Sequence, residues 1–212
     1  MAGIPQNFQE ISNVIPTYQF IDLAAGTGFI SFYAGKTVDL NLLSNYQFYS
    51  DNITTYASIP QGSYELIIDN DFDVVFNRPI NISGLTILNI PIGLTGSQVN
   101  CDINSYIVVT LKKWDGVTET TIATNQTTQV NMATNGSYYY MTATDLNIPL
   151  THIKIGETLR LTLECYAKYN HAVGGTQNFI LGHDPKSRTT GWDTTGAVPS
   201  QLVLQLPVRL NL

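Results

Sequence analysis

The alternation of apolar and polar residues between Ile153 and Tyr169 constrains the fold of this chain more than any other feature. Four apolar residues alternate with four polar ones there: Leu159, Leu161, Leu163 and Cys165 with Arg160, Thr162, Glu164 and Tyr166. A period of two residues is that of a β-strand with one buried face and one face in water. Just ahead, Gly156 and Glu157 are residues of the kind that end one strand and start another. The segment therefore predicts a long, half-buried strand of an all-β sandwich.

Strand patterns recur along the whole chain, with turn residues between them. We expect strands near 18–23, 28–35, 47–49, 53–58, 64–68, 72–76, 80–94, 103–113, 117–123, 126–132, 137–142, 153–169 and 201–210. The pair Asp115-Gly116 is the strongest hairpin signal, and Asp69-Asn70-Asp71 predicts a second tight hairpin. No segment shows a convincing helical period. The sequence predicts an all-β fold, an antiparallel β-sandwich of jelly-roll type with about ten strands.

The chain reads as a single domain, 17–212, preceded by an extended N-terminal arm, 1–16. The apolar residues of the arm favour docking on a neighbouring subunit, and they are Ile4, Phe8, Ile11, Val14 and Ile15. Between 170 and 200 the strand pattern breaks into a long loop rich in Gly, Thr and Pro, and loops of that length tend to be functional. Its candidate interaction residues are His183, Asp184, Arg188 and Trp192. Trp192 either folds back over the sheet or anchors a subunit contact or a ligand.

Composition excludes several classes of function. Hydrophobic residues make up 43% of the chain and charged residues only 12%, which argues against disorder. The net charge of -6 and the absence of any Lys/Arg run argue against nucleic-acid binding. No apolar run approaches the roughly 20 residues that span a bilayer, and residues 1–20 lack the features of a signal peptide. We expect a soluble protein without a secretion signal.

Catalytic and metal motifs are missing from the sequence. It has no nucleophile elbow, no zinc-protease helix and no phosphate-binding glycine loop, and the spacing of its three histidines is not that of metal ligands. The acids Asp69, Asp71 and Asp73 resemble the start of a calcium loop but lack its glycine and its final acid, so a plain turn is the better interpretation. Cys101 and Cys165 are expected as reduced thiols, although a disulfide between them stays open. We expect no enzyme, no cofactor and no metal.

Several phrases of the chain resemble a family of viral proteins. These are GTGFISFYAGK, LKKWDGVTETTIA, IKIGETLRLTLECYAK and the Gly-His-Asp-Pro-Lys-Ser-Arg loop ahead of a final LVLQLPVRL strand. From Tyr18 onward they are similar to the small jelly-roll virion proteins of tailed phages and related environmental viruses. The resemblance implies a non-enzymatic capsid-associated protein, either a decoration or a minor head protein, located in virions that assemble in the host cytoplasm. It also implies viral capsid proteins as partners and a homo-oligomer, with a trimer favoured.

A second hypothesis is a carbohydrate-binding or host-recognition domain of a virion fibre or spike. It would use Trp192 and the tyrosines of the Tyr138-Tyr139-Tyr140 run as surfaces on which a glycan stacks. A third hypothesis, a glycan hydrolase built on acids such as Asp71 and Asp73, has no catalytic motif to support it.

Overall fold

The structure, a computed structural model, describes residues 27–97, 102–133, 135–170 and 175–209. These residues form twelve strands: β1 (Thr27–Lys36), β2 (Asn41–Ser44), β3 (Thr54–Ser58), β4 (Glu65–Val75), β5 (Ile80–Gly96), β6 (Asp102–Trp114), β7 (Glu119–Gln126), β8 (Val130–Met132), β9 (Gly136–Ile153), β10 (Thr158–Asn170), β11 (Gln177–Gly182) and β12 (Leu202–Arg209). Within the described ranges there is no helix long and apolar enough to cross a membrane. The predicted fold class, an all-β antiparallel sandwich, is confirmed.

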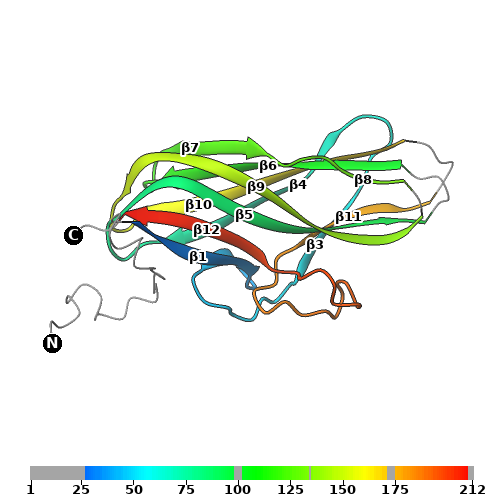
Figure 1. The fold of residues 1–212 in the computed structure, drawn as a ribbon, viewed down its shortest axis with the longest axis horizontal. Helices are drawn as coiled ribbons and strands as arrows, with labels where there is room; N and C mark the ends of the chain where they lie inside the picture. The colour runs from blue at the N-terminus through cyan, green and yellow to red at the C-terminus, as the bar shows by residue number, and fades with distance from the viewer. Residues whose placement is uncertain (1–26, 98–101, 134, 171–174, 210–212) are drawn as a thin grey trace.

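The strands lie in two layers, shown in Figure 1. The front layer holds β9, β5, β12 and β1, and is extended by β11 and β3. The back layer holds β4, β10 and β6, with β7 and β8 both paired to β6. Strand β2 joins the two layers through a single parallel pair, Leu42 with Asp73. On the opposite side the edge strands meet, where Asn125 Nδ2 donates to the carbonyl of Asp145 at 2.8 Å.

Strand β5 organises the front layer because it has a partner on each side. It pairs with β9 along nearly its whole length, and on its other side it pairs first with β12 and then with β11. This arrangement explains where three prolines lie. Pro91 stands where the partner changes from β12 to β11, while Pro149 and Pro207 stand at breaks in the β9–β5 and β12–β5 registers. A proline has no N–H for a ladder, so it fits at these gaps, although Pro91 and Pro207 belong to strands paired on both sides and not to a sheet margin.

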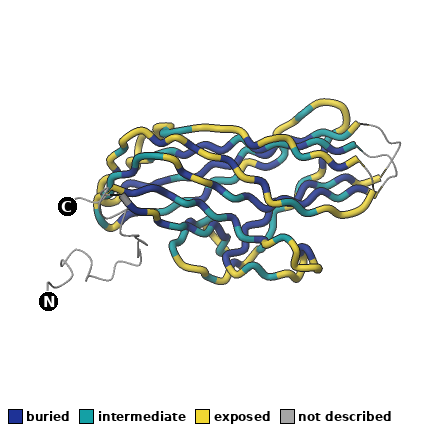
Figure 2. Tube along the Cα trace, in the orientation of Figure 1, coloured by how far each residue is buried: buried dark blue, intermediate teal, exposed yellow. Residues whose placement is uncertain are grey.

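Alternating apolar residues from both layers fill the core. Leu159, Leu161 and Leu163 of β10 are fully buried, which confirms the half-buried strand predicted for that segment. Other strands of the two layers add Phe32, Phe72, Leu88 and Leu204. Figure 2 shows this as alternation of buried and exposed positions along most strands.

One predicted hairpin is confirmed and the other is wrong. At Asp115-Gly116 the chain reverses, Gly116 has a φ of 98°, and the Asp115 carboxylate accepts from the N–H groups of Val117 and Thr118. At Asp69-Asn70-Asp71, however, β4 runs straight through and pairs with β10. The acids alternate along a strand with a wet outer face, and a polar run on such a face looks like a turn in sequence.

The predicted long loop at 170–200 also needs correction. Residues 177–182 of that range form β11, which lies between β3 and β5 with Phe179 and Leu181 buried. Only the part after Gly182 is an extended connection, running to Leu202. The predicted arm, 1–16, lies outside the described residues.

Candidate functional site

The outer face of the front layer carries a group of bare apolar side chains. Phe29 of β1, Leu85 and Ile87 of β5, and Met141 of β9 are 44, 52, 39 and 40% exposed. Side chains two apart on a strand, and side chains directly paired across strands, share one face of a sheet. Phe29 pairs with Pro207 of β12, and Ile87 pairs with Gln205, two residues from Pro207, so these positions adjoin. Met141 lies further along the same face, where it pairs with Pro91, four residues from Ile87. We call Phe29, Leu85, Ile87 and Met141 the apolar patch.

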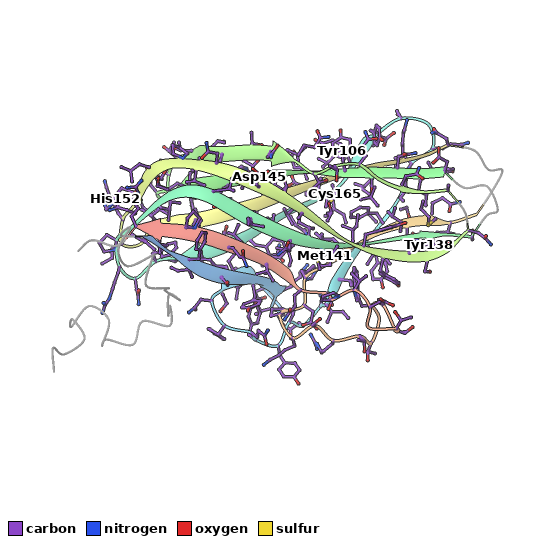
Figure 3. All side chains as sticks on the ribbon, in the orientation of Figure 1. Tyr106, Tyr138, Met141, Asp145, His152 and Cys165 are labelled. Atoms are coloured by element: carbon purple, nitrogen blue, oxygen red, sulfur yellow. The ribbon has the colours of Figure 1, made fainter. Side chains whose placement is uncertain are left out.

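Few charges lie near this patch. Among the outward positions of β1, β12, β5 and β9 at this end of the layer, Asp145 and Arg209 are the charged side chains, and Asp145 pairs directly with Ile87. Figure 3 labels Met141 and Asp145 on β9, the strand that lies toward the viewer. A partner that covered the patch would therefore have to remove few charges from water.

The opposite end of the same face is covered by the chain's own loop, residues 183–201. Trp192 is only 2% exposed, its ring lies 4.8 Å from that of Tyr139 on β9, and its indole N–H donates to the carbonyl of Val198 at 2.8 Å. A Cβ at Gly182 would lie 3.0 Å from Pro91 and 3.1 Å from Trp192. Of the two roles left open for Trp192, the structure supports covering the sheet, because the buried indole ring presents no face on which a glycan could stack.

The other residues predicted in this loop hold it together. Asp184 is fully buried, and its carboxylate accepts from the backbone N–H groups of Lys186 and Arg188 and from the Arg188 guanidinium. His183 is buried as well, and its Nε2 lies 3.0 Å from Thr55 Oγ1. Burial lowers the pKa of His183 from 6.5 to about 4, so the ring is neutral at physiological pH.

His183, Asp184 and Trp192 are therefore buried within the chain itself. Arg188 does reach the surface, where its guanidinium lies 5.2 Å from the centre of the Tyr49 ring. The remaining predicted interaction residues, Ile4, Phe8, Ile11 and Val14, lie outside the described part of the chain.

The outer face of the back layer differs sharply from the apolar patch, because it is charged. Arg160 donates to both carboxylate oxygens of Asp73 at 2.8 and 2.7 Å, and its NH1 group lies 2.9 Å from Glu119 and 3.5 Å from Asp71. These acids raise the pKa of Arg160 above its usual value. The Arg160 guanidinium thus occupies the place between Asp71 and Asp73 where a calcium ion would lie if these acids formed a calcium site. Among the described residues no group of three or more His, Cys, Asp or Glu is arranged to hold a metal.

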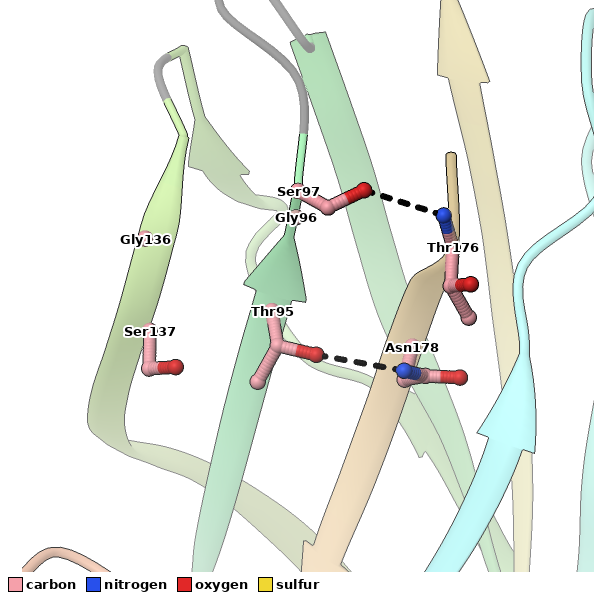
Figure 4. Close-up of a pocket in the computed structure, with 7 residues that line it drawn as sticks. All are labelled: Thr95, Gly96, Ser97, Gly136, Ser137, Thr176 and Asn178. Carbon is pink, nitrogen blue, oxygen red and sulfur yellow. Dashed lines mark hydrogen bonds between the residues drawn. The ribbon is translucent and has the colours of Figure 1, made fainter. Parts of the chain in front are cut away.

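A shallow polar depression lies at the far end of β5, shown in Figure 4. It has a volume of about 310 Å³, and hydroxyls, amides and glycines line it: Thr95, Gly96, Ser97, Gly136, Ser137, Thr176 and Asn178. Two of its side chains are already paired, because Ser97 Oγ accepts from the Thr176 N–H and Asn178 Nδ2 donates to Thr95 Oγ1. None of these seven residues is an acid, a base or a thiol that could take part in catalysis. Cys165 is remote from any such role, since it is buried and burial raises its pKa.

Sequence reasoning missed the apolar patch, although β5 carried a signal for it. The run from Ile80 to Leu94 is apolar at both odd and even positions, as in Leu85, Ile87 and Leu88. Strands that are apolar on both sides are typical of sheets covered on both faces. The run predicts a strand, and the apolar residues of its second face are the signal in the sequence for the patch.

No protein-family model matches the chain, and no curated protein matches it. Solved structures do resemble it. An α-amino acid ester hydrolase has a TM-score of 0.57 at 11% identity, with 85% of this chain and 36% of the hydrolase covered. An aminopeptidase from a marine sediment archaeon of the Thaumarchaeota has a TM-score of 0.55 at 7% identity, covering 86% and 37%. A CocE/NonD family hydrolase from Staphylococcus aureus has a TM-score of 0.50 at 13% identity, again covering 86% and 37%.

These comparisons correct the prediction that the chain is not an enzyme. The fold interpreted as that of a virion protein is also found within hydrolases, so lack of a catalytic motif in this chain no longer argues against an enzyme. At these identities the likeness shows the fold alone, and the chain spans little more than a third of the length of the hydrolases. Viral capsid structures also match, among them the VP2 subviral particle of infectious bursal disease virus, but its TM-score of 0.31 is too low to carry an argument.

Proposed function

We propose that this chain is a β-sandwich assembly module that docks on other protein subunits through the apolar patch. The observation that carries the proposal is the contrast between its two outer faces. The back layer presents ion pairs to water beside exposed apolar residues such as Val75, whereas the front layer presents Phe29, Leu85, Ile87 and Met141 with few charges among them. Exposed apolar side chains that gather on one face of a protein mark interaction sites.

The half-covered state of the face supports the same proposal. Where residues 183–201 lie on the front layer, Trp192 of the loop is buried against a half-buried Tyr139, whereas the four patch residues have no such cover among the described residues. Full burial of one Leu, Ile, Phe or Met side chain is worth about 1.5–3 kcal/mol. A partner that covers the four patch residues therefore has several kcal/mol of burial to gain, before the cost of association.

We place the module in a virion, as a capsid-associated decoration or minor head protein that forms a homo-oligomer, with a trimer favoured. The support for this is the resemblance of its strand and loop phrases to virion proteins of that kind. Mass spectrometry of purified particles tests it, because a structural component is present in a fixed ratio to the major capsid protein. Absence of the chain from intact particles would contradict the assignment.

The docking surface is tested with a matched pair of lysine variants. Ile87→Lys places a charge in the patch, and Val75→Lys places one at a more exposed apolar position on β4 of the back layer. Light scattering across a concentration series should show association in the wild type and in Val75→Lys. Ile87→Lys should shift the association midpoint at least tenfold, about 1.4 kcal/mol. Equal association of the two variants would refute the docking surface.

As a second candidate, we propose that the chain is the β-sandwich portion of a hydrolase and packs its apolar patch on the catalytic portion. The observation favouring it is the fold likeness to three hydrolytic enzymes over 85–86% of the chain. The measurement is release of p-nitrophenol from p-nitrophenyl butyrate by material that copurifies with the chain from its native source. Activity retained by Val75→Lys and lost with Ile87→Lys would favour this candidate over the virion role, and no activity with either would remove it.

A further inference from the structure

The polar depression at the far end of β5 has the composition of a binding site for an uncharged ligand. It spans the ends of three neighbouring strands, β9, β5 and β11, as Figure 4 shows. Its volume of about 310 Å³ lies at the lower end of the range for small-molecule sites, about 300–1,000 Å³. We propose that this depression binds a neutral carbohydrate. The apolar patch lies further back along β5, at Leu85 and Ile87, so the inference is independent of the proposed docking function.

The lining offers hydrogen-bonding groups that the described residues leave unused. Ser97 Oγ accepts from the Thr176 N–H at 3.0 Å, and its own O–H remains to donate. Asn178 Nδ2 donates to Thr95 Oγ1 at 3.4 Å, so the Asn178 carbonyl oxygen remains to accept. The hydroxyls of Ser137 and Thr176 have no partner in the part of the chain that the structure describes. Hydroxyl groups both donate and accept, which matches the hydroxyls of a sugar.

A buried amide beside two glycines is an independent sign of a ligand. Gln177 is 3% exposed, yet neither its Oε1 nor its Nε2 has a hydrogen-bond partner among the described residues. Gly96 pairs directly with Gln177 on one side and with Gly136 on the other, so the three positions share one face of the sheet. The two glycines line the depression and carry no side chain that could pair with the amide. An unpaired buried amide is costly, and a hydroxyl of a ligand placed over the glycines would pair with it.

Tyr138 places an aromatic ring at the border of the depression. Its side chain is 39% exposed, and Figure 3 shows it near the end of β9. A Cβ at Gly136 would lie 3.2 Å from the ring, and Gly136 has a φ of 130°, so only a glycine suits this position. An exposed tyrosine ring has an apolar face on which the C–H face of a sugar can pack. Of the aromatic residues considered for a glycan from the sequence, Tyr138 is exposed whereas Trp192 is buried.

The lack of charge decides between classes of small ligand. No Asp, Glu, Lys, Arg or His occurs in the segments that form and border the depression, 54–58, 92–97, 136–142 and 176–182. A phosphate, carboxylate or ammonium group would find no opposite charge there to offset its loss of water. Small-molecule sites are mostly apolar, whereas this one is lined by hydroxyls, an amide and glycines, which favours a ligand rich in hydroxyls. A neutral sugar meets both conditions.

Saturation-transfer difference NMR with neutral disaccharides tests the proposal in the full chain. The probes are lactose, maltose, cellobiose and N,N′-diacetylchitobiose, and 3′-sialyllactose is the charged comparison. The site variants are Tyr138→Ala and Gln177→Met, which keeps the length of the side chain but removes its amide. The matched control is Tyr49→Ala, which removes a ring that is 73% exposed and lies outside the depression. Urea unfolding without sugar gives the stability of each protein.

We expect saturation transfer to at least one neutral disaccharide, with a dissociation constant about tenfold higher in Gln177→Met and Tyr138→Ala than in the wild type. Tyr49→Ala should bind as the wild type does. Gln177→Met should also unfold at a higher urea concentration than the wild type, because it removes a buried amide that has no partner in the ligand-free fold. A glutamine that serves only the fold would instead lose stability on this change.

Several results would overturn the proposal. One is the lack of saturation transfer to any of the neutral disaccharides, and another is wild-type binding in either site variant. Stronger binding of 3′-sialyllactose than of lactose would contradict a neutral site. Loss of binding together with a lower unfolding midpoint in Gln177→Met would also contradict it, since the amide would then have its partner within the fold.

Discussion

The stability of this protein should fall steeply as pH drops from 7 to 5, because one buried histidine cannot accept a proton in the folded state. His183 is 1% exposed, its ring lies against Phe72 with centroids 5.8 Å apart, and its Nδ1 has no hydrogen-bond partner within the described structure. Desolvation by burial is the largest cause that lowers its pKa, the nearby Lys36 lowers it further, and Asp184 only partly offsets them.

The sign follows from which state binds the proton. Above pH 6.5 the ring is neutral in both states, so the free energy of unfolding does not depend on it. Between pH 6.5 and about 4 the unfolded chain binds a proton at His183 and the folded chain does not, so unfolding becomes easier as pH falls. The full difference of about 2.5 pKa units is worth roughly 3 kcal/mol, of which about 2 kcal/mol is lost between pH 7 and pH 5.

Urea unfolding followed by circular dichroism at pH 7, 6 and 5 measures this, with His183→Gln as the comparison. The wild type should lose about 2 kcal/mol more than the variant over that range. The comparison matters because all other titrating groups are present in both proteins and cancel in the difference. Parallel pH curves for the two proteins would refute the buried neutral histidine.

Three further changes test the packing of the front face and the charged back face. Trp192→Ala should cost about 3–5 kcal/mol in urea unfolding, because it removes a buried ring and leaves the Val198 carbonyl without its donor; a loss below about 1 kcal/mol would mean the loop is not part of the folded structure. Gly93→Ala should lower the melting temperature, since a Cβ there would lie 2.9 Å from the Tyr139 ring; an unchanged value would show that the ring moves freely. Arg160→Gln should cost about 1–2 kcal/mol at low salt and less at high salt, because the pairs are partly exposed; a loss independent of salt would contradict an electrostatic origin.

The strands could be predicted wherever one face is buried and the other is wet. In β10 the alternation from Leu159 to Tyr166 suffices, and at Asp115-Gly116 the turn is local, so neighbours along the chain determine it. Strand prediction failed where the pairing with a distant strand, and not the local sequence pattern, determines the conformation. The run from Asp69 to Asp73 has the composition of a turn, and it is a strand because it pairs with β10, which places Arg160 and Thr162 opposite the acids. Residues 177–182 lie in a sequence with the composition of a loop, and they form a strand because β3 and β5 pair with them on either side.

The candidate site was less predictable than the fold. The sequence showed that Trp192 and His183 were unusual for a polar loop, but not that they turn inward, because burial depends on residues far away in sequence such as Tyr139 and Thr55. The patch residues come from three strands, and the first and last of them, Phe29 and Met141, are more than a hundred residues apart along the chain. No single patch residue differs from its sequence neighbours in a way that would predict its exposure.

The sequence by itself determined that this chain is a β-sandwich, because a period of two residues and its turns are local properties of the covalent chain. The tertiary structure alone decided which apolar side chains remain bare. Both faces of β5 are apolar in sequence, and only the placement of the other layer and of residues 183–201 leaves Phe29, Leu85, Ile87 and Met141 uncovered. The surface on which the proposed function depends is therefore a property of the folded chain as a whole, because strand pairing decides which face of each strand stays exposed.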